Sequence, residues 1–109
     1  MTVHIVNSAK IDWVLTANVL DDGVVILPTI TKSAHGFIVV SANGVIEESA
    51  EFEIDSTGTA SVIRDRGTVV VNADTDANLC IGTAAAQNPM TIKNRLGGTK
   101  TIIITLWYN

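Results

Sequence analysis

Short apolar stretches recur along the chain, and Gly, Asn, Asp and Ser residues separate them. This pattern is typical of β-strands joined by short turns. Ten short strands in a chain of this length predict a single all-β domain, an antiparallel β-sandwich or jelly roll. The predicted strands are Val3–Val6, Ile11–Leu15, Val24–Ile30, Gly36–Ala42, Glu51–Ile54, Ala60–Arg64, Thr68–Asn72, Leu79–Thr83, Met90–Lys93 and Thr101–Tyr108.

Two kinds of strand pattern occur. The segment from Glu51 to Asp55 alternates, which predicts Phe52 and Ile54 in the core and the three carboxylates in solvent. Val69–Val71 and Ile102–Ile104 are apolar at every position instead. Such strands carry apolar side chains on both faces. We therefore expect each to lie between two layers or to have its outer face covered by a partner.

The turn residues support the strand boundaries. Asn43-Gly44 predicts a tight hairpin. Ser56-Thr57-Gly58 and Asp65-Arg66-Gly67 each have the length of a hairpin loop between the strands that flank them. Asp21-Asp22-Gly23 predicts a turn with Gly23 at positive φ, and Leu96-Gly97-Gly98 precedes the last strand.

Composition favours the same fold class. Val, Ile and Thr occur 13 times each among 109 residues, and β-branched side chains fit a pleated surface better than a helix. The length is that of one domain. Cys80 is the single cysteine, so no intrachain disulfide is expected. The chain opens without a basic and then apolar signal segment, and no apolar run approaches the ~18 residues of a membrane span. We expect a protein made in a reducing compartment, without a membrane partner.

The charge is acidic and unevenly distributed. The net charge of −4 is a poor match for phosphate, so nucleic acid is not an expected partner. Residues 1–87 carry a net charge of −7, whereas residues 88–109 carry +3 from Lys93, Arg95 and Lys100. One interpretation is that neighbouring strands of one sheet compensate each other. The other is that an acidic face and a basic face meet between subunits, which favours head-to-tail association.

Candidate metal and nucleophile sites are weak. Residues 72, 74, 76 and 78 bear side-chain oxygens, as in the first half of a calcium loop, but a loop that begins at Asn72 lacks the Gly at its sixth position and the Glu at its twelfth. A turn stabilised by local hydrogen bonds is favoured. Cys80 lies in an apolar strand and is expected to be buried and inert. Together with His4 and His35 it matches no zinc spacing. We predict no metal ion and no cofactor.

The chain shows no recognisable catalytic motif. A glycosidase needs two carboxylates that face each other across a cleft, which proximity in the sequence does not show. Glu51, Glu53 and Asp55 point to the same side of one strand, which favours a solvated face. Nucleophile-elbow, Ser-x-x-Lys and phosphate-loop motifs are missing from the sequence. We therefore predict a structural or binding module and not an enzyme, with a small enzyme as the least favoured hypothesis.

The aromatic residues suggest contact surfaces. Trp107 and Tyr108 are adjacent on a predicted strand, so only one of them can face the core. The other is available for core-edge cover, for a subunit or host-protein contact, or for stacking on a sugar ring. We predict an interface formed by aromatic residues and by basic residues near the C-terminus. The predicted interface residues are Trp13, Lys93, Arg95, Trp107 and Tyr108.

Four segments carry a resemblance to a known group of proteins. They are Gly36–Val40, Glu51–Ile54, Ala73–Ile81 and Thr91–Gly97, of which Lys93-Asn94-Arg95-Leu96-Gly97 is the most specific, and an apolar strand ending Leu106-Trp107-Tyr108 follows. On these residues, the stretch from about Ala34 to Tyr108 resembles a β-rich domain of tailed-bacteriophage virion proteins, which include head decoration proteins and fibre tips.

The resemblance implies a structural role in a virion, commonly as a trimer, with no catalytic residues. Residues 34–109 would form the β-sandwich core, and residues 1–33 an attachment arm or the first strands. So short an N-terminal segment favours a stand-alone capsid decoration (cement) protein over a long fibre. The implied partner is the major capsid protein or another virion protein, and the implied location is the capsid surface after synthesis in the host cytoplasm. The alternative is a receptor- or carbohydrate-binding tip of a fibre.

Overall fold

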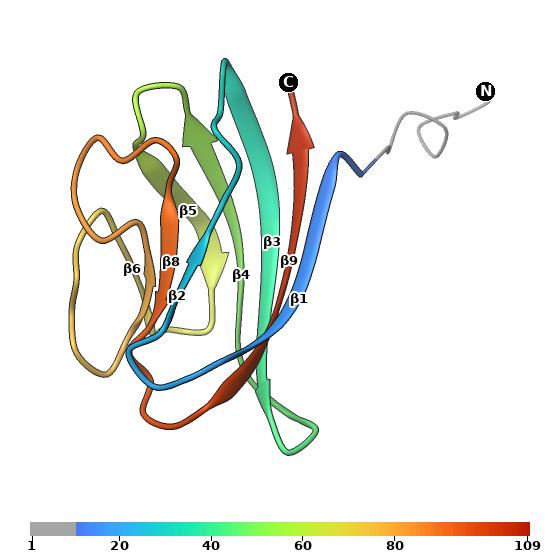
Figure 1. The fold of residues 1–109 in the computed structure, drawn as a ribbon, viewed down its shortest axis with the longest axis vertical. Helices are drawn as coiled ribbons and strands as arrows, with labels where there is room; N and C mark the ends of the chain where they lie inside the picture. The colour runs from blue at the N-terminus through green and yellow to red at the C-terminus, as the bar shows by residue number, and fades with distance from the viewer. Residues whose placement is uncertain (1–10) are drawn as a thin grey trace.

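A computed structural model describes residues 11–109, which form a β-sandwich of nine strands (Figure 1). The described residues contain no helix, and so none that could cross a membrane. The strands are β1 (Trp13–Val19), β2 (Val24–Ile26), β3 (Ser33–Ala42), β4 (Val45–Asp55), β5 (Ala60–Asp65), β6 (Val69–Val71), β7 (Leu79–Ile81), β8 (Thr91–Asn94) and β9 (Lys100–Tyr108).

The strands form two sheets. The larger has five strands in the order β1-β9-β3-β4-β5, and the smaller has four in the order β2-β8-β7-β6. All pairs are antiparallel except β6–β7, which is parallel. The all-β sandwich predicted from the sequence is thus confirmed. Nine of the predicted strands have a counterpart, and Val3–Val6 lies outside the described residues.

The core lies between the two sheets. Inward-facing residues of the long strands β9 and β4 are fully buried, among them Ile102, Ile104 and Phe52. The smaller sheet supplies Leu79, Ile81, Met90 and Ile92 to the same core. The predicted alternation on β4 is confirmed, since Phe52 and Ile54 are buried whereas Glu53 and Asp55 are exposed.

A glycine on β3 permits the closest packing in this core. A Cβ at Gly36 would lie 2.6 Å from Phe52 Cζ and 2.8 Å from Leu106 Cδ2. Neither group can move aside easily, because one belongs to an aromatic ring and both are fully buried. Gly36 therefore lets the Phe52 ring lie directly against the β3 backbone.

Of the turn predictions, the one for Asp65-Arg66-Gly67 is wrong and the one for Asp21-Asp22-Gly23 is confirmed only in part. Asn43 and Gly44 have φ values of 52° and 80° and close the β3–β4 hairpin, and Ser56-Thr57-Gly58 lies in the β4–β5 hairpin. Asp65-Arg66-Gly67 does not close a hairpin, because β5 and β6 belong to different sheets and this loop crosses between them. In the first turn Asp22, with φ of 61°, takes the left-handed conformation in place of Gly23. Gly23 is needed for space, since a Cβ there would lie 2.8 Å from the Leu20 carbonyl oxygen.

A buried carboxylate holds the β5–β6 crossover against β4. Glu48 is fully buried and accepts hydrogen bonds from the backbone N–H groups of Ser49 (2.7 Å), Arg66 (2.8 Å) and Thr68 (2.8 Å), and from the Thr68 hydroxyl. Burial opposes ionisation, but the hydrogen bonds outweigh it, so the pKa of Glu48 is lowered below its ordinary value. Sequence patterning gave no sign of this role, since Glu48 belongs to an acidic run.

The segment before residue 34 contributes to both sheets. Strand β1 pairs with β9 in the larger sheet, and β2 pairs with β8 in the smaller one. Residues 1–33 were expected to form either an attachment arm or the first strands of the sandwich. The structure shows that residues 13–26 contain the first strands. Residues 1–10 lie outside the described part of the chain.

Candidate functional site

The outward side of the five-stranded sheet carries exposed apolar side chains, and we call it the open face. Its residues follow from the strand registers, because residues directly opposite each other point to the same side of a sheet. They are Val14, Thr16 and Asn18 on β1; Thr101, Ile103, Thr105 and Trp107 on β9; His35, Phe37, Val39 and Ser41 on β3; Ser49, Glu51 and Glu53 on β4; and Ser61 and Arg64 on β5.

The open face changes in character across the sheet. One row runs Val14, Thr105, Phe37, Glu51, Arg64 from β1 to β5. Its first three positions are apolar or bear a methyl group, and its last two are charged. A half-solvated antiparallel sheet normally has polar side chains outside. Val14 (55% exposed) and Phe37 (42%) depart from that rule, and so does Ile103 (41%) in the next row.

Three rings gather on this face at one end of β3 and β9. His35 lies directly across from Trp107, and Phe37 is two residues along the same strand. The Phe37 and Trp107 rings meet edge to face with centroids 5.6 Å apart, and His35 meets Phe37 in the same way at 5.5 Å. The rings fix one another in place, since edge-to-face contacts are the preferred aromatic geometry.

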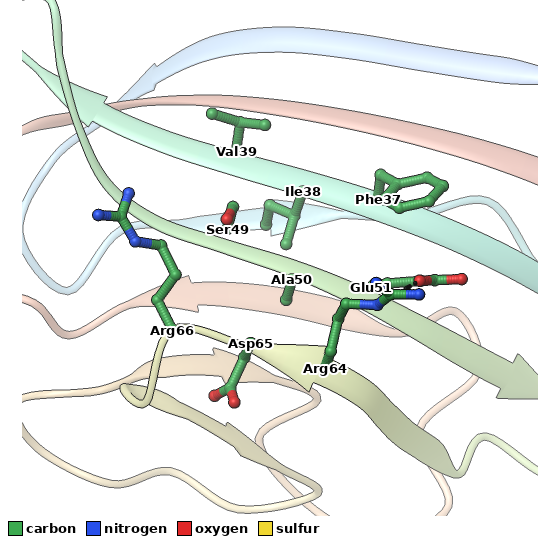
Figure 2. Close-up of a pocket in the computed structure, with 9 residues that line it drawn as sticks. All are labelled: Phe37, Ile38, Val39, Ser49, Ala50, Glu51, Arg64, Asp65 and Arg66. Carbon is green, nitrogen blue, oxygen red and sulfur yellow. Dashed lines mark ion pairs between the residues drawn. The ribbon is translucent and has the colours of Figure 1, made fainter.

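Ion pairs border the aromatic group on the β4–β5 side. Glu51 bridges His35 Nε2 at 2.8 Å and Arg64 Nε at 3.0 Å. Beside it a hollow of about 280 Å³ opens between β3, β4 and β5. Figure 2 shows the Phe37 ring, the Glu51–Arg64 pair and Arg66 around this hollow.

This arrangement is suited to binding a surface. The hollow is shallow, and its volume is at the lower limit for sites that enclose a small molecule. Glu51 lies within 3.0 Å of a nitrogen atom of both His35 and Arg64, so its carboxylate is surrounded by polar groups. Exposed apolar and aromatic side chains beside a charged margin resemble the anatomy of a protein–protein interface, which has an apolar centre and a polar rim.

The predicted interface residues do not form one site. Trp107 lies on the open face, half-buried, and Tyr108 beside it is 44% exposed at the end of β9. Trp13 points to the inner side of β1 and packs against the core. Lys93 and Arg95 belong to the other sheet and the loop that follows it.

The basic residues of the C-terminal segment are paired within the chain. Lys93 Nζ lies 2.8 Å from Asp74, Arg95 contacts Asp74 at 3.1 Å, and Lys100 lies 2.5 Å from Glu47. Lys93 is the main cause of the lowered pKa of Asp74. These contacts support charge compensation within the chain. The paired residues do not lie on adjacent strands, however, because Asp74 is in a loop and β3 separates β9 from β4.

The Lys93-Asn94-Arg95 element alternates between surface and interior. Asn94 is fully buried, and its side-chain N–H groups donate to the carbonyl oxygens of Val19 (3.0 Å), Leu20 (3.2 Å) and Gly98 (2.9 Å). Asn94 thus ties the end of β1 in one sheet to β8 in the other. The most specific motif of the sequence therefore has a structural role in this chain.

The weak candidate sites have structural explanations. In Asn72–Asn78, the Asn72 side chain bonds both backbone groups of Ala60, and Asp74 is occupied by Lys93 and Arg95. Cys80 is buried as expected, and burial raises the pKa of its thiol. Within residues 11–109, no group of three or more His, Cys, Asp or Glu side chains is arranged to hold a metal ion.

Sequence patterning missed most of the open face. The apolar signal was the Ile102–Ile104 run, which predicted apolar side chains on both faces of one strand, and Ile103 is indeed exposed. Trp107 was the other apolar residue of this face that the sequence singled out. Val14, Phe37 and the Glu51 ion pairs come together only through strand pairings that the sequence does not specify. No family model, curated protein or solved structure matches the chain.

Proposed function

We propose that the open face attaches this domain to a larger protein assembly, and that the chain is a non-enzymatic bacteriophage virion protein, a capsid decoration protein that stabilises the outer capsid surface. The observation that carries the proposal is the exposure of Val14, Phe37 and Ile103 on a sheet whose opposite face is buried in the core along β3, β4 and β9. Apolar patches of this kind on rigid modules are typical of interaction sites.

The physical basis of stabilisation is mass action. A protein that binds the assembled shell but not free coat subunits shifts the equilibrium toward the shell. The rigid sandwich loses little conformational freedom on binding, so less of the contact energy is lost to ordering. The Glu51–Arg64 margin supplies orientation by charge complementarity, and the apolar rows supply buried area.

The test uses undecorated heads of the bacteriophage whose genome carries this sequence. Purified chain is mixed with heads or with unassembled coat subunits, and each mixture is sedimented. We expect saturable co-sedimentation with heads only, together with a higher disassembly temperature of the heads. Binding to neither species, or to free subunits as strongly as to heads, contradicts the proposal.

Two matched variants locate the surface. Ile103→Thr changes the open face, whereas Ile26→Thr makes the same substitution at an exposed position (65%) on the smaller sheet. We expect the first to weaken binding to heads about tenfold and the second to leave it unchanged. The opposite ranking would place the contact on the smaller sheet and reject the open face.

A second candidate is a receptor- or carbohydrate-binding fibre tip. One observation favours it: the edge-to-face pair Phe37–Trp107 lies beside Glu51, so apolar ring surface and hydrogen-bonding groups adjoin. A glycan array and competition for phage adsorption separate the two functions. Glycan binding that Trp107→Ala abolishes, without binding to heads, would replace the decoration proposal.

A further inference from the structure

Within the described part of the chain, β1 is an edge strand of the five-stranded sheet. Among residues 11–109, β1 pairs with β9 on one side and with no strand on the other. Its seven residues, Trp-Val-Leu-Thr-Ala-Asn-Val, include no charge and no proline, and its register with β9 is regular. Natural proteins protect edges with charges, prolines or bulges, because a bare edge is a template for pairing with another strand.

The inner side of β1 is also incompletely covered. Trp13, Leu15 and Ala17 face inward but are only half-buried. Their direct partners on β9, which are Leu106, Ile104 and Ile102, are fully buried. The core is therefore closed at β9 and open along β1, at the same edge where backbone groups lack a partner strand.

The strand is complementary to itself. Residues directly opposite each other must point to the same side, so two antiparallel copies of β1 can pair only in registers that keep this parity. The register that uses all seven residues has its two-fold axis at Thr16. It places Trp13 opposite Val19 and Leu15 opposite Ala17 on the inner side, so each large residue meets a smaller one.

We propose that this edge is a contact between two copies of the chain, in which β1 pairs antiparallel with β1 of the second copy about a two-fold axis at Thr16. The pairing joins the two larger sheets into one continuous sheet and covers the half-buried inner row of both copies. It is isologous, so it closes with two copies. It does not rest on the proposed function, and it differs from the trimer that the family resemblance implies.

The first test is the native mass of the full chain over a range of concentrations. We expect a dimer that dissociates on dilution. Thr16→Lys places like charges opposite each other at the axis and should weaken the dimer by about fivefold or more. Ser61→Lys makes a comparable change on the other edge strand and should have no effect. A monomer at all concentrations, a trimer, or equal effects of the two variants would overturn the proposal.

Cysteine cross-linking tests the register. Opposed residues in an antiparallel pair have Cβ atoms about 4.5–5.5 Å apart, within reach of a disulfide after small adjustments. Thr16→Cys should form a covalent dimer by itself on mild oxidation. Val14→Cys and Asn18→Cys should cross-link with each other but not with themselves. Cys80 is buried and does not compete. Failure of Thr16→Cys to cross-link, or self-linking of Val14→Cys, would reject the axis at Thr16.

Discussion

The two edge strands of the five-stranded sheet, β1 and β5, differ in how they are secured. Strand β5 carries the charged residues Arg64 and Asp65, and its register with β4 is interrupted by a bulge. Glu48 and Asp65 bond the backbone of the loop that follows it. Strand β1 has no charge and no bulge, and its buried polar anchor is Asn94 at its C-terminal end. Strand β5 is therefore protected against pairing with a strand of another chain, whereas β1 is suited to such pairing.

The largest effect is expected at the secured edge. Glu48→Ala leaves the N–H groups of Ser49, Arg66 and Thr68 without their acceptor in a buried site. We expect a loss of about 3 kcal/mol in the free energy of unfolding, measured by urea denaturation. Glu53→Ala, at an exposed position of the same strand, is the control and should cost less than ~0.5 kcal/mol. Equal costs would show that the hydrogen bonds of Glu48 contribute nothing to the free energy of unfolding.

The next effect concerns the anchor of β1. Asn94→Ala removes the donors to the Val19, Leu20 and Gly98 carbonyl groups, and we expect a loss of about 2 kcal/mol. Asn18→Ala, on β1 itself, removes a single surface hydrogen bond from the Thr101 hydroxyl on β9 and should change stability by less than ~0.5 kcal/mol. If the two variants unfold at the same urea concentration, β1 is not anchored at its end.

The third effect is the pH dependence of stability that Glu48 contributes at the β5 edge. Because the pKa of Glu48 is lowered from 4.5 in the folded chain, its ionised form stabilises the fold above pH 4.5, and this stabilisation is lost as the pH falls through the folded pKa. Comparing the wild type with Glu48→Gln cancels the contributions of Asp55 and Asp74, which are also lowered. We expect the stability difference to be constant near neutral pH and to shrink below pH 4.5. A difference that does not change with pH would contradict this.

The smallest effect is expected at the open face of β1. Val14→Thr keeps the β-branched shape of an exposed residue and should change stability by less than ~0.5 kcal/mol, as measured by thermal unfolding. The same substitution at Val25, which is 8% exposed, buries a hydroxyl and should cost about 1–3 kcal/mol. Similar losses at both positions would mean that Val14 contributes to the fold itself and is not simply available for a partner.

The sequence predicted the elements better than their arrangement. Alternation at Phe52 and Ile54 and the Asn43-Gly44 turn are local signals, and both were interpreted correctly. The loop Asp65-Arg66-Gly67 has the length and residues of a hairpin, but its flanking strands join different sheets. Nothing within a short loop encodes which sheet the next strand joins, because long-range packing decides it.

The candidate site was predictable only in part for the same reason. Trp107 was singled out because it is aromatic and adjacent to Tyr108, but its neighbours His35 and Phe37 lie some seventy residues away. Lys93 and Arg95 had the composition of an interface, yet Asp74 already occupies both. Charge counts along a chain record how many ions there are, and only the fold shows which are already paired.

The position of β9 between β1 and β3 has a consequence for synthesis. Strand β9 follows every other described strand in the sequence, yet it is the partner of both. While a ribosome is still translating residues 100–108, β1 has no partner among the described strands and β3 has only β4. The larger sheet therefore cannot close during elongation, and its apolar rows remain open to other nascent chains until β9 emerges.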